Sequence, residues 1–321
     1  MAEPVPHVLD RAATTYVAGH GGLVGSSVWR HLQAQGFTDL VGARSSELDL
    51  TDRAAVFGFL GRTRPDVVVL AAAKVGGIAA NSAYPYDFWS TNLQIQVNVM
   101  DAALAVGVPR LLFLGSSCIY PRLAPQPIRE DSLLTGALEI TNDAYAIAKI
   151  AGVLGVQAVR RQHGLDWVSA MPTNLYGPGD NFSPNGSHVL PALIRRYDDA
   201  AAQSAASVTN WGTGTPRREL LHTDDLASAV LHLLEHYHHG DPINIGTGTD
   251  LPIAEIADLV ATATGFTGST AWDSSKPDGT PRKVLDTSRI NHLGWTPTTG
   301  LREGITDTVR WYREHRGELR R

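Results

Sequence analysis

The chain of 321 residues contains a single cysteine, Cys118, and only four lysines. One thiol excludes an internal disulfide framework and any zinc site that requires several cysteines, and it fits the reducing cytoplasm. Basic residues are in the minority, since 27 Lys and Arg stand against 32 Asp and Glu and give a formal net charge of −5. This balance disfavours nucleic acid or an anionic membrane as a partner, and it favours a small molecule.

Long hydrophobic runs are missing as well. No apolar segment approaches the roughly 20 residues that a membrane-spanning helix needs, and residues 1–17 lack the pattern of a secretory signal. No repeat of 20 to 50 residues is visible. We therefore expect a globular, cytoplasmic protein without a membrane partner, built as one large domain or two unequal ones.

Strand and helix patterns alternate through the first half of the chain. Apolar or β-prone runs at 14–18, 39–42, 67–73, 110–114 and 167–171 predict strands, and helical periodicity covers 23–35, 52–61, 85–106 and 143–162. A continuous apolar strand such as 67–73 is typical of a buried parallel sheet. The alternation predicts an α/β fold with a Rossmann-like, doubly wound parallel sheet.

The alternation breaks after Thr173, where loops rich in Gly, Pro and Asn begin. Helices are expected at 190–196, 224–236, 253–265 and 301–315, with strands at 208–212 and 242–245. We predict two interleaved domains. Residues 1–173 plus about 219–249 form a dinucleotide-binding Rossmann domain, and residues 174–218 plus 250–321 form a smaller substrate domain.

A glycine-rich turn joins the first expected strand to the first expected helix. Gly19, Gly22 and Gly25 follow the spacing GxxGxxG. Glycines there let the backbone approach a pyrophosphate, which the positive end of the helix attracts. A tight packing turn without a ligand is the alternative, because a glycine triplet alone is a weak motif.

Tyr145 and Lys149 lie four residues apart on a predicted helix, hence on one face. An adjacent ammonium lowers the pKa of a phenol from about 10 toward the range in which it transfers protons at neutral pH. An ordinary exposed tyrosine and lysine are the alternative. Because the chain has only four lysines, a specific role for Lys149 is favoured.

Further candidates follow two other strands. Ser116 and Cys118 come after the strand at 110–114, at the edge where open α/β sheets bind ligands, and His188 follows the segment 172–182. Ser116 is suited to donate a hydrogen bond to a carbonyl oxygen beside Tyr145. Cys118 is a base if its thiol pKa is lowered, and otherwise a buried structural cysteine.

Two loops, 211–219 and 276–283, combine basic pairs with Gly, Thr and Pro. Arginines in such loops suit a diphosphate, although charged surface turns have the same composition. The histidines at 232, 236, 238 and 239 lie at the end of a helix with few carboxylates near them in the sequence. We therefore predict no metal site.

Several strings occur together in one order: AAAKVGGI (71–78), LLFLGSSCIYP (111–121), NDAYAIAKIAG (142–152), MPTNLYGPGDNF (171–182) and SKPDGTPRK (275–283). With them the chain resembles the extended short-chain dehydrogenase/reductase superfamily from residue 16 to about 312, and within it the GDP-L-fucose synthase family. That family converts GDP-4-keto-6-deoxy-D-mannose by C3/C5 epimerisation and NAD(P)H-dependent C4 reduction. The resemblance implies a GDP-sugar as the partner and a homodimer formed through the helices at 85–106 and 143–162.

The resemblance also implies roles for individual residues. Ser116, Tyr145 and Lys149 would form the reductase triad, and Cys118 and His188 would move protons at C3 and C5. Arg196, Trp211, Arg218 and Asp278 would bind the GDP-sugar. The cofactor-binding residues would be Gly19, Gly22, Leu23, Val24, Gly25, Arg44, Leu114, Gly115, Ser116, Lys149, Pro172, Asn174, Leu175 and His188.

One departure concerns the cofactor. Gly21 and Ser45 stand where the family typically has arginines that hold the 2′-phosphate of NADP, although Arg44 is adjacent. NADP(H) is expected, and NAD(H) stays open. A 4,6-dehydratase would place acidic residues at 117–118, and a C4 epimerase or a 4-reductase without epimerisation would not need Cys118 and His188. A non-catalytic dinucleotide-sensing module would tolerate the loss of Tyr145 and Lys149, whose presence argues against it.

Overall fold

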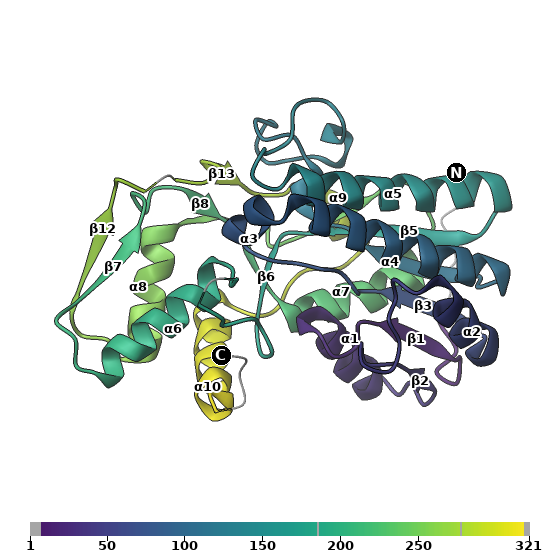
Figure 1. Ribbon diagram of the computed structural model, residues 1–321, viewed down its shortest axis with the longest axis horizontal. Helices are drawn as coiled ribbons and strands as arrows, with labels where there is room; N and C mark the ends of the chain where they lie inside the picture. The colour runs from purple at the N-terminus through teal and green to yellow at the C-terminus, as the bar shows by residue number, and fades with distance from the viewer. Residues whose placement is uncertain (1–7, 185, 277, 318–321) are drawn as a thin grey trace.

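A six-stranded parallel sheet forms the centre of the computed structural model, which describes residues 8–184, 186–276 and 278–317 (Figure 1). The strand order is β10-β5-β4-β3-β1-β2, and each neighbouring pair is parallel. The strands are β1 (Thr15–Ala18), β2 (Leu40–Val41), β3 (Val67–Leu70), β4 (Arg110–Leu114), β5 (Asp166–Pro172) and β10 (Ile243–Ile245). The predicted doubly wound sheet is confirmed, and the order reverses between β1 and β3, where such sheets bind ligands.

Helices cover both faces of this sheet. α1 (Leu23–Ala34) and α7 (Thr223–His236) pack on one face, around a core that includes Val17, Leu32 and Val230. α2 (Arg53–Thr63), α4 (Pro85–Ala105) and α5 (Asp143–His163) pack on the other, around Val68 and Leu111. Because both faces are covered, strands β1, β3 and β4 are buried along their whole length, as their continuous apolar runs indicate.

A smaller lobe lies beside the carboxyl edge of the sheet (Figure 1). It contains α6 (Val189–Ala202), α8 (Ile253–Thr264), α10 (Leu301–His315) and a parallel ribbon of β7 (Ser207–Trp211) and β12 (Ser269–Asp273). These elements share a third core, which includes Ile194, Val260 and Tyr312. The lobe is built from segments on both sides of α7 and β10, whereas β10 itself pairs with β5 of the large sheet. The exact domain boundaries stay a prediction.

Short strands connect the two lobes. β6 (Asn174–Tyr176) pairs with β9 (Leu220–His222), and β8 (Arg217–Arg218) lies between β11 (Leu251–Pro252) and β13 (Arg282–Lys283). The parallel pairing of β8 with β13 brings together the two basic loops that are distant in the sequence. This small sheet is therefore the element that carries basic residues to the edge of the large one.

The sequence prediction misses these short strands, and it also misses α3 (Ile78–Ala83), α9 (Ser288–His292) and the 3-10 turns η1 (Ser117–Ile119) and η2 (Glu130–Ser132). Elements of two to six residues are too short to show a period. The strand predicted at 67–73 ends at Leu70, and the helix predicted at 190–196 extends over Val189–Ala202.

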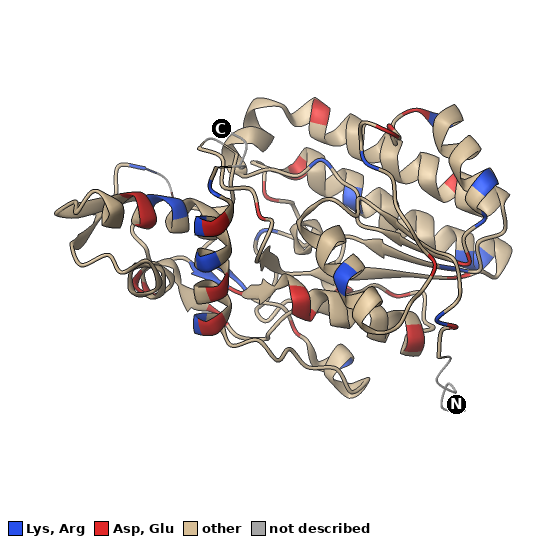
Figure 2. Cartoon of the chain, turned by 90° about the horizontal axis from the view of Figure 1, so that it is seen from below, with Lys and Arg blue, Asp and Glu red and all other residues tan. Residues whose placement is uncertain are grey.

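The surface carries both signs of charge. Lys and Arg and Asp and Glu are interspersed over both lobes (Figure 2). Within the described part of the chain, no helix combines the length and the apolar character that crossing a membrane requires. The mixed charge agrees with the composition.

Candidate active site

Ser116 and Cys118 lie in the loop that leaves β4, at the carboxyl edge of the sheet. Ser116 is extended and precedes η1, and its Oγ accepts a hydrogen bond of 3.2 Å from the amide of Cys118. A Cβ at Gly115 would lie 2.4 Å from Cε of Met171, so the loop packs closely on the end of β5. This packing fixes the serine hydroxyl and the thiol in one compact turn.

The helix α5 carries Tyr145 and Lys149 to the same place. Lys149 is buried, with 4% of its surface exposed, and its Nζ donates a hydrogen bond of 2.8 Å to the carbonyl oxygen of Leu114. The same Nζ lies 6.0 Å from the centroid of the Tyr145 ring. The spacing of four residues therefore places both side chains on the helix face that meets the end of β4.

The pKa values of this pair differ from the expectation. Burial raises the pKa of Tyr145 well above its usual value, the negative charge of Cys118 raises it further, and Ser116 lowers it only in part. Burial also lowers the pKa of Lys149 to about 8. The predicted lowering of the phenol pKa by Lys149 is therefore wrong for this structure, because burial is the larger effect. Tyr145 is a neutral phenol that can give a proton.

Lys283 is a neighbour of Cys118 that sequence reasoning did not single out. Its Nζ donates a hydrogen bond of 3.4 Å to Sγ of Cys118 from β13. Burial acts to raise the pKa of the thiol, but the Lys283 ammonium and hydrogen bonds with Ser116, Lys283 and Asn142 outweigh it. The pKa of Cys118 is therefore below its ordinary value, which favours the thiolate.

His188 immediately precedes α6 of the smaller lobe, and it is near enough to Lys283 for that charge to affect its pKa. The segment before it is held against the large domain, because the Gly77 amide donates a hydrogen bond of 3.3 Å to the Gly186 carbonyl oxygen. Burial and the charge of Lys283 lower the pKa of His188. Lys283 thus acts on both residues that the sequence assigned to proton transfer.

Two of the residues expected to bind the GDP-sugar, Arg218 and Asp278, lie in and next to the strands β8 and β13. Arg218 is held by the carbonyl oxygens of Arg217 and Thr280, at 2.7 and 2.6 Å from its Nη1. Asp278 accepts hydrogen bonds from the amide and hydroxyl of Thr213, at 2.9 and 2.8 Å. Both contacts connect the loops around β8 and β13, so the two basic loops form one wall.

Arg196 and Trp211 belong to the same lobe. Nη1 of Arg196 donates to Oδ1 of Asn210 at 2.5 Å, and the indole of Trp211 is 70% exposed. The Nζ of Lys276 lies 5.7 Å from the centroid of the Trp211 ring. An exposed indole with a cation beside it offers a flat apolar face to a ring system.

The other arginines of the two loops have structural partners. Arg217 and Arg282 form ion pairs with Asp250, at 3.2 and 2.7 Å. Since successive residues of a strand point to opposite faces, Arg218 and Lys283 are left on the side of Cys118. Of the arginines in these two loops, Arg218 is therefore the one left on the side of the candidate site, where it can meet a diphosphate.

The glycine turn fits a dinucleotide. A Cβ at Gly25 would lie 2.0 Å from the carbonyl oxygen of Gly19, and one at Gly19 would lie 2.8 Å from the backbone of Ala72. Because the residue before α1 is Gly22, no side chain competes for the first amides of the helix, to which a pyrophosphate binds. Leu23 and Val24 begin this helix.

The remaining predicted cofactor residues surround the same edge. Leu114 ends β4, Pro172 ends β5, and Leu175 lies in β6 beside it. The side-chain Nδ2 of Asn174 donates a hydrogen bond of 3.0 Å to the Glu219 carbonyl oxygen, which helps to fix this strand. Arg44 follows β2, the strand next to β1. Placement at one edge agrees with the prediction, but contact with a cofactor stays a prediction.

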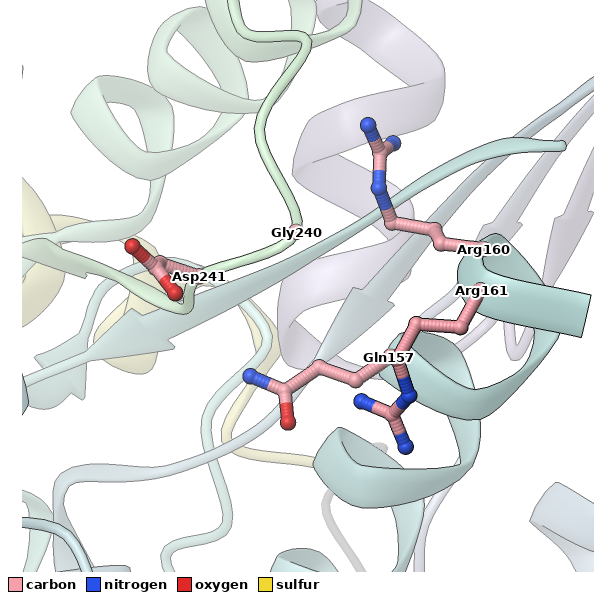
Figure 3. Close-up of a pocket in the computed structure, with 5 residues that line it drawn as sticks. All are labelled: Gln157, Arg160, Arg161, Gly240 and Asp241. Atoms are coloured by element: carbon pink, nitrogen blue, oxygen red, sulfur yellow. The ribbon is translucent and has the colours of Figure 1, made fainter. Parts of the chain in front are cut away.

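Two cavities lie away from this site. One of about 440 Å³ is lined by Gln157, Arg160, Arg161, Gly240 and Asp241 (Figure 3). Gln157 is twelve residues beyond Tyr145 on α5, or about 18 Å along the helix. The other, of about 550 Å³, is lined by Asp166 and His238, which share a hydrogen bond, and by neighbouring residues. No group of His, Cys, Asp or Glu that could hold a metal is found among the described residues.

Comparison with known proteins defines the class of protein first. Residues 15–246 match the NAD dependent epimerase/dehydratase family, and the chain belongs to this family, whose cofactor is a nicotinamide dinucleotide. A probable GDP-L-fucose synthase 1 of Oryza sativa subsp. japonica is 57% identical over 97% of this chain and 96% of its own length. The GDP-L-fucose synthase of Escherichia coli (strain K12) is 49% identical over 95% of this chain and 98% of its own. These relatives confirm the resemblance seen in the sequence.

Solved structures give the same picture. A GDP-L-fucose synthetase from Naegleria fowleri bound to NADP has a TM-score of 0.90, with 27% identity over 98% of each chain. A GDP-6-OMe-4-keto-L-xylo-heptose reductase from C. jejuni has a TM-score of 0.89, with 33% identity over 96% of this chain and 99% of that one. The fold is thus shared with an enzyme named as a synthetase and with one named as a reductase.

Proposed function

We propose that the chain converts GDP-4-keto-6-deoxy-D-mannose to GDP-L-fucose by epimerisation at C3 and C5 and by reduction at C4. The observation that carries the proposal is the placement of Cys118 in the same turn as Ser116, beside Tyr145 and in contact with Lys283. One ketone can therefore meet a proton donor for reduction and a thiolate for epimerisation. The near full-length relatives named as GDP-L-fucose synthases support the same substrate.

Epimerisation depends on the acidity that a ketone confers on its neighbouring carbons. The Cys118 thiolate removes a proton from carbon, so a C–H bond breaks, an S–H bond forms, and the electron pair moves toward the ketone oxygen. Ser116 and Tyr145 stabilise this enolate oxygen by hydrogen bonds. The imidazolium of His188 returns a proton to the opposite face, and exchange with solvent restores both groups.

Reduction follows at the same carbonyl. The nicotinamide dinucleotide that the glycine turn would hold would supply the hydride for C4. Tyr145 gives its phenolic proton to the carbonyl oxygen. The raised pKa of Tyr145 keeps this proton in place across the neutral range. Lys149, whose Nζ lies 6.0 Å from the phenol ring centroid, provides the positive charge that stabilises the phenolate left behind.

The preferred cofactor is NADPH. The NADP-bound synthetase with a TM-score of 0.90 supports this choice. Arg44 follows the strand next to the glycine turn, so its guanidinium is the one we assign to the 2′-phosphate in place of arginines at 21 and 45.

Turnover of GDP-4-keto-6-deoxy-D-mannose in deuterated water, with NADPH and NADH in parallel, tests the proposal. The product sugar is identified by NMR. GDP-L-fucose that carries deuterium at C3 and C5, formed faster with NADPH, is the expected result. Equal rates with NADPH and NADH would contradict the assignment of Arg44 to the 2′-phosphate.

A 4-reductase without epimerisation is the second candidate, since the reductase from C. jejuni has a TM-score of 0.89. It predicts GDP-D-rhamnose or its C4 epimer without deuterium. Cys118→Ala separates the two functions: in a synthase it slows deuterium incorporation far more than reduction of a ready-made epimer. In a simple reductase it changes neither. A protein that binds dinucleotide but turns over no sugar would be the sensing module.

A further inference from the structure

We propose that Lys283 is a positioning residue that holds Cys118 as a thiolate and thereby makes the thiol the base of the epimerisation. The inference deepens the proposed function and rests on it for the reaction that the thiolate serves. The stabilisation of the thiolate by the ammonium does not depend on the substrate and can be measured on the protein alone.

The contact joins two distant parts of the chain. Lys283 and Cys118 are 165 residues apart, and the Nζ–Sγ distance is 3.4 Å. The strand β13 brings the lysine there, because Arg282 pairs with Arg217 and Lys283 pairs with Arg218 in parallel register. Asp250 holds Arg217 and Arg282 on the opposite side, at 3.2 and 2.7 Å. The alternation along β13 then directs Lys283 toward Cys118.

The titratable groups around the thiol come from three elements. Lys283 of β13 and Arg218 of β8 are cationic, and Tyr145 of α5 is a neutral phenol that the thiolate charge affects. Ser116 and Asn142 form hydrogen bonds with the thiol, and both are uncharged. Lys283 is the cation in direct contact, so its removal should have the largest effect on the thiol.

Lys283 also acts electrostatically on both residues of the proton-transfer pair, Cys118 and His188. Its charge lowers the pKa of His188 while it lowers that of Cys118. A cation favours the deprotonated form of both groups. Cys118, held as the thiolate, is therefore the residue ready to remove the first proton, and His188 has to take up a proton from solvent before it can return one to carbon.

The single cysteine makes the test direct. The rate of alkylation of the full-length protein by iodoacetamide, measured against pH, titrates Cys118 alone. Lys283→Met should raise the midpoint by about one pH unit or more, the range for loss of an adjacent opposite charge. The midpoint is the correct readout, because the intrinsic reactivity of a thiolate rises with its pKa and offsets part of the change in rate.

Lys283→Arg keeps the charge and should restore a low midpoint. Lys74→Met is the matched control, because it removes a lysine that pairs with Asp87 at 3.1 Å and should leave the midpoint unchanged. A wild-type midpoint in folded Lys283→Met would overturn the proposal. If Lys283→Met does not fold, a midpoint in Lys283→Gln equal to that of the wild type would overturn it equally.

A second measurement connects the thiol to the reaction. In Lys283→Met the acid limb of the pH profile for deuterium incorporation at C3 and C5 should move up with the alkylation midpoint, and higher pH should recover kcat. A lysine that only binds substrate would raise KM without moving that limb, which contradicts the proposal. A protein that shows the midpoint shift but makes no GDP-L-fucose would refute the proposed function and leave the ammonium–thiolate contact established.

Discussion

At the scale of single residues, Tyr145 is a buried phenol with a raised pKa and so keeps its proton until a reduced ketone needs one. Tyr145→Phe retains the ring and removes the hydroxyl group that carries this proton. We expect reduction to slow by at least ~10²-fold, the usual contribution of a general acid. The rate of oxidation of NADPH measures the effect, with cofactor binding followed by fluorescence as the control. Near-normal turnover would remove Tyr145 from the mechanism.

Lys149 predicts the pH dependence of the same step. Burial lowers its pKa to about 8, so the ammonium is present below this pH and is lost above it. If the ammonium stabilises the phenolate, kcat for reduction falls as the pH rises through about 8. Lys149→Arg, whose charge persists, should extend activity to higher pH. A profile that is flat to pH 10 in the wild type would show that the charge is not needed.

At the scale of elements, the turn between β1 and α1 offers room for a specificity change. Nothing lies within 4 Å of a Cβ built at Gly21, so a longer side chain fits there without displacing the backbone. Gly21→Arg should increase the preference for NADPH over NADH by about tenfold or more, since charged hydrogen bonds contribute roughly 1.5–3 kcal/mol. The ratio of kcat/KM values measures it, and Gly21→Gln is the uncharged control. An unchanged ratio would mean that the 2′-phosphate lies elsewhere.

Elements with a regular pattern were predictable from the sequence. The periodicity of α5 places Tyr145 and Lys149 on one face, and the continuous apolar runs of β1, β3 and β4 indicate a sheet covered on both sides. The contact between Cys118 and Lys283 was not predictable in this way. It depends on β8 and β13, which have two residues each, and on a parallel pairing that no local pattern encodes.

The pKa of Tyr145 was also beyond sequence reasoning. The spacing to Lys149 correctly gives proximity, but the electrostatic outcome depends on how deeply the phenol is buried. Burial is a property of the packed lobes around the site. Residue types and the family resemblance therefore singled out the groups of the candidate site, while their protonation required the three-dimensional structure.

At the scale of the whole molecule, we propose a homodimer formed through α4 and α5. These helices expose large apolar side chains: Trp89 by 38%, Val97 by 47%, Ile147 by 45% and Leu154 by 42%. An apolar surface shared by two adjacent helices is typical of an interface. The double variant Val97→Glu/Leu154→Glu should sediment as a monomer, whereas the wild type sediments as a dimer. Leu123→Glu, at a site 84% exposed and outside both helices, is the control. A monomeric wild type would contradict the proposal.

The late position of β13 in the chain sets the order in which the site matures on the ribosome. All six strands of the large sheet have emerged once β10 is complete, and the glycine turn is then already in place. β11, α8 and β12 must still follow before Lys283 appears. A growing chain thus carries Cys118 as an ordinary, mostly protonated thiol. Under the proposal above, the ammonium that favours the thiolate reaches Cys118 only when synthesis is nearly finished.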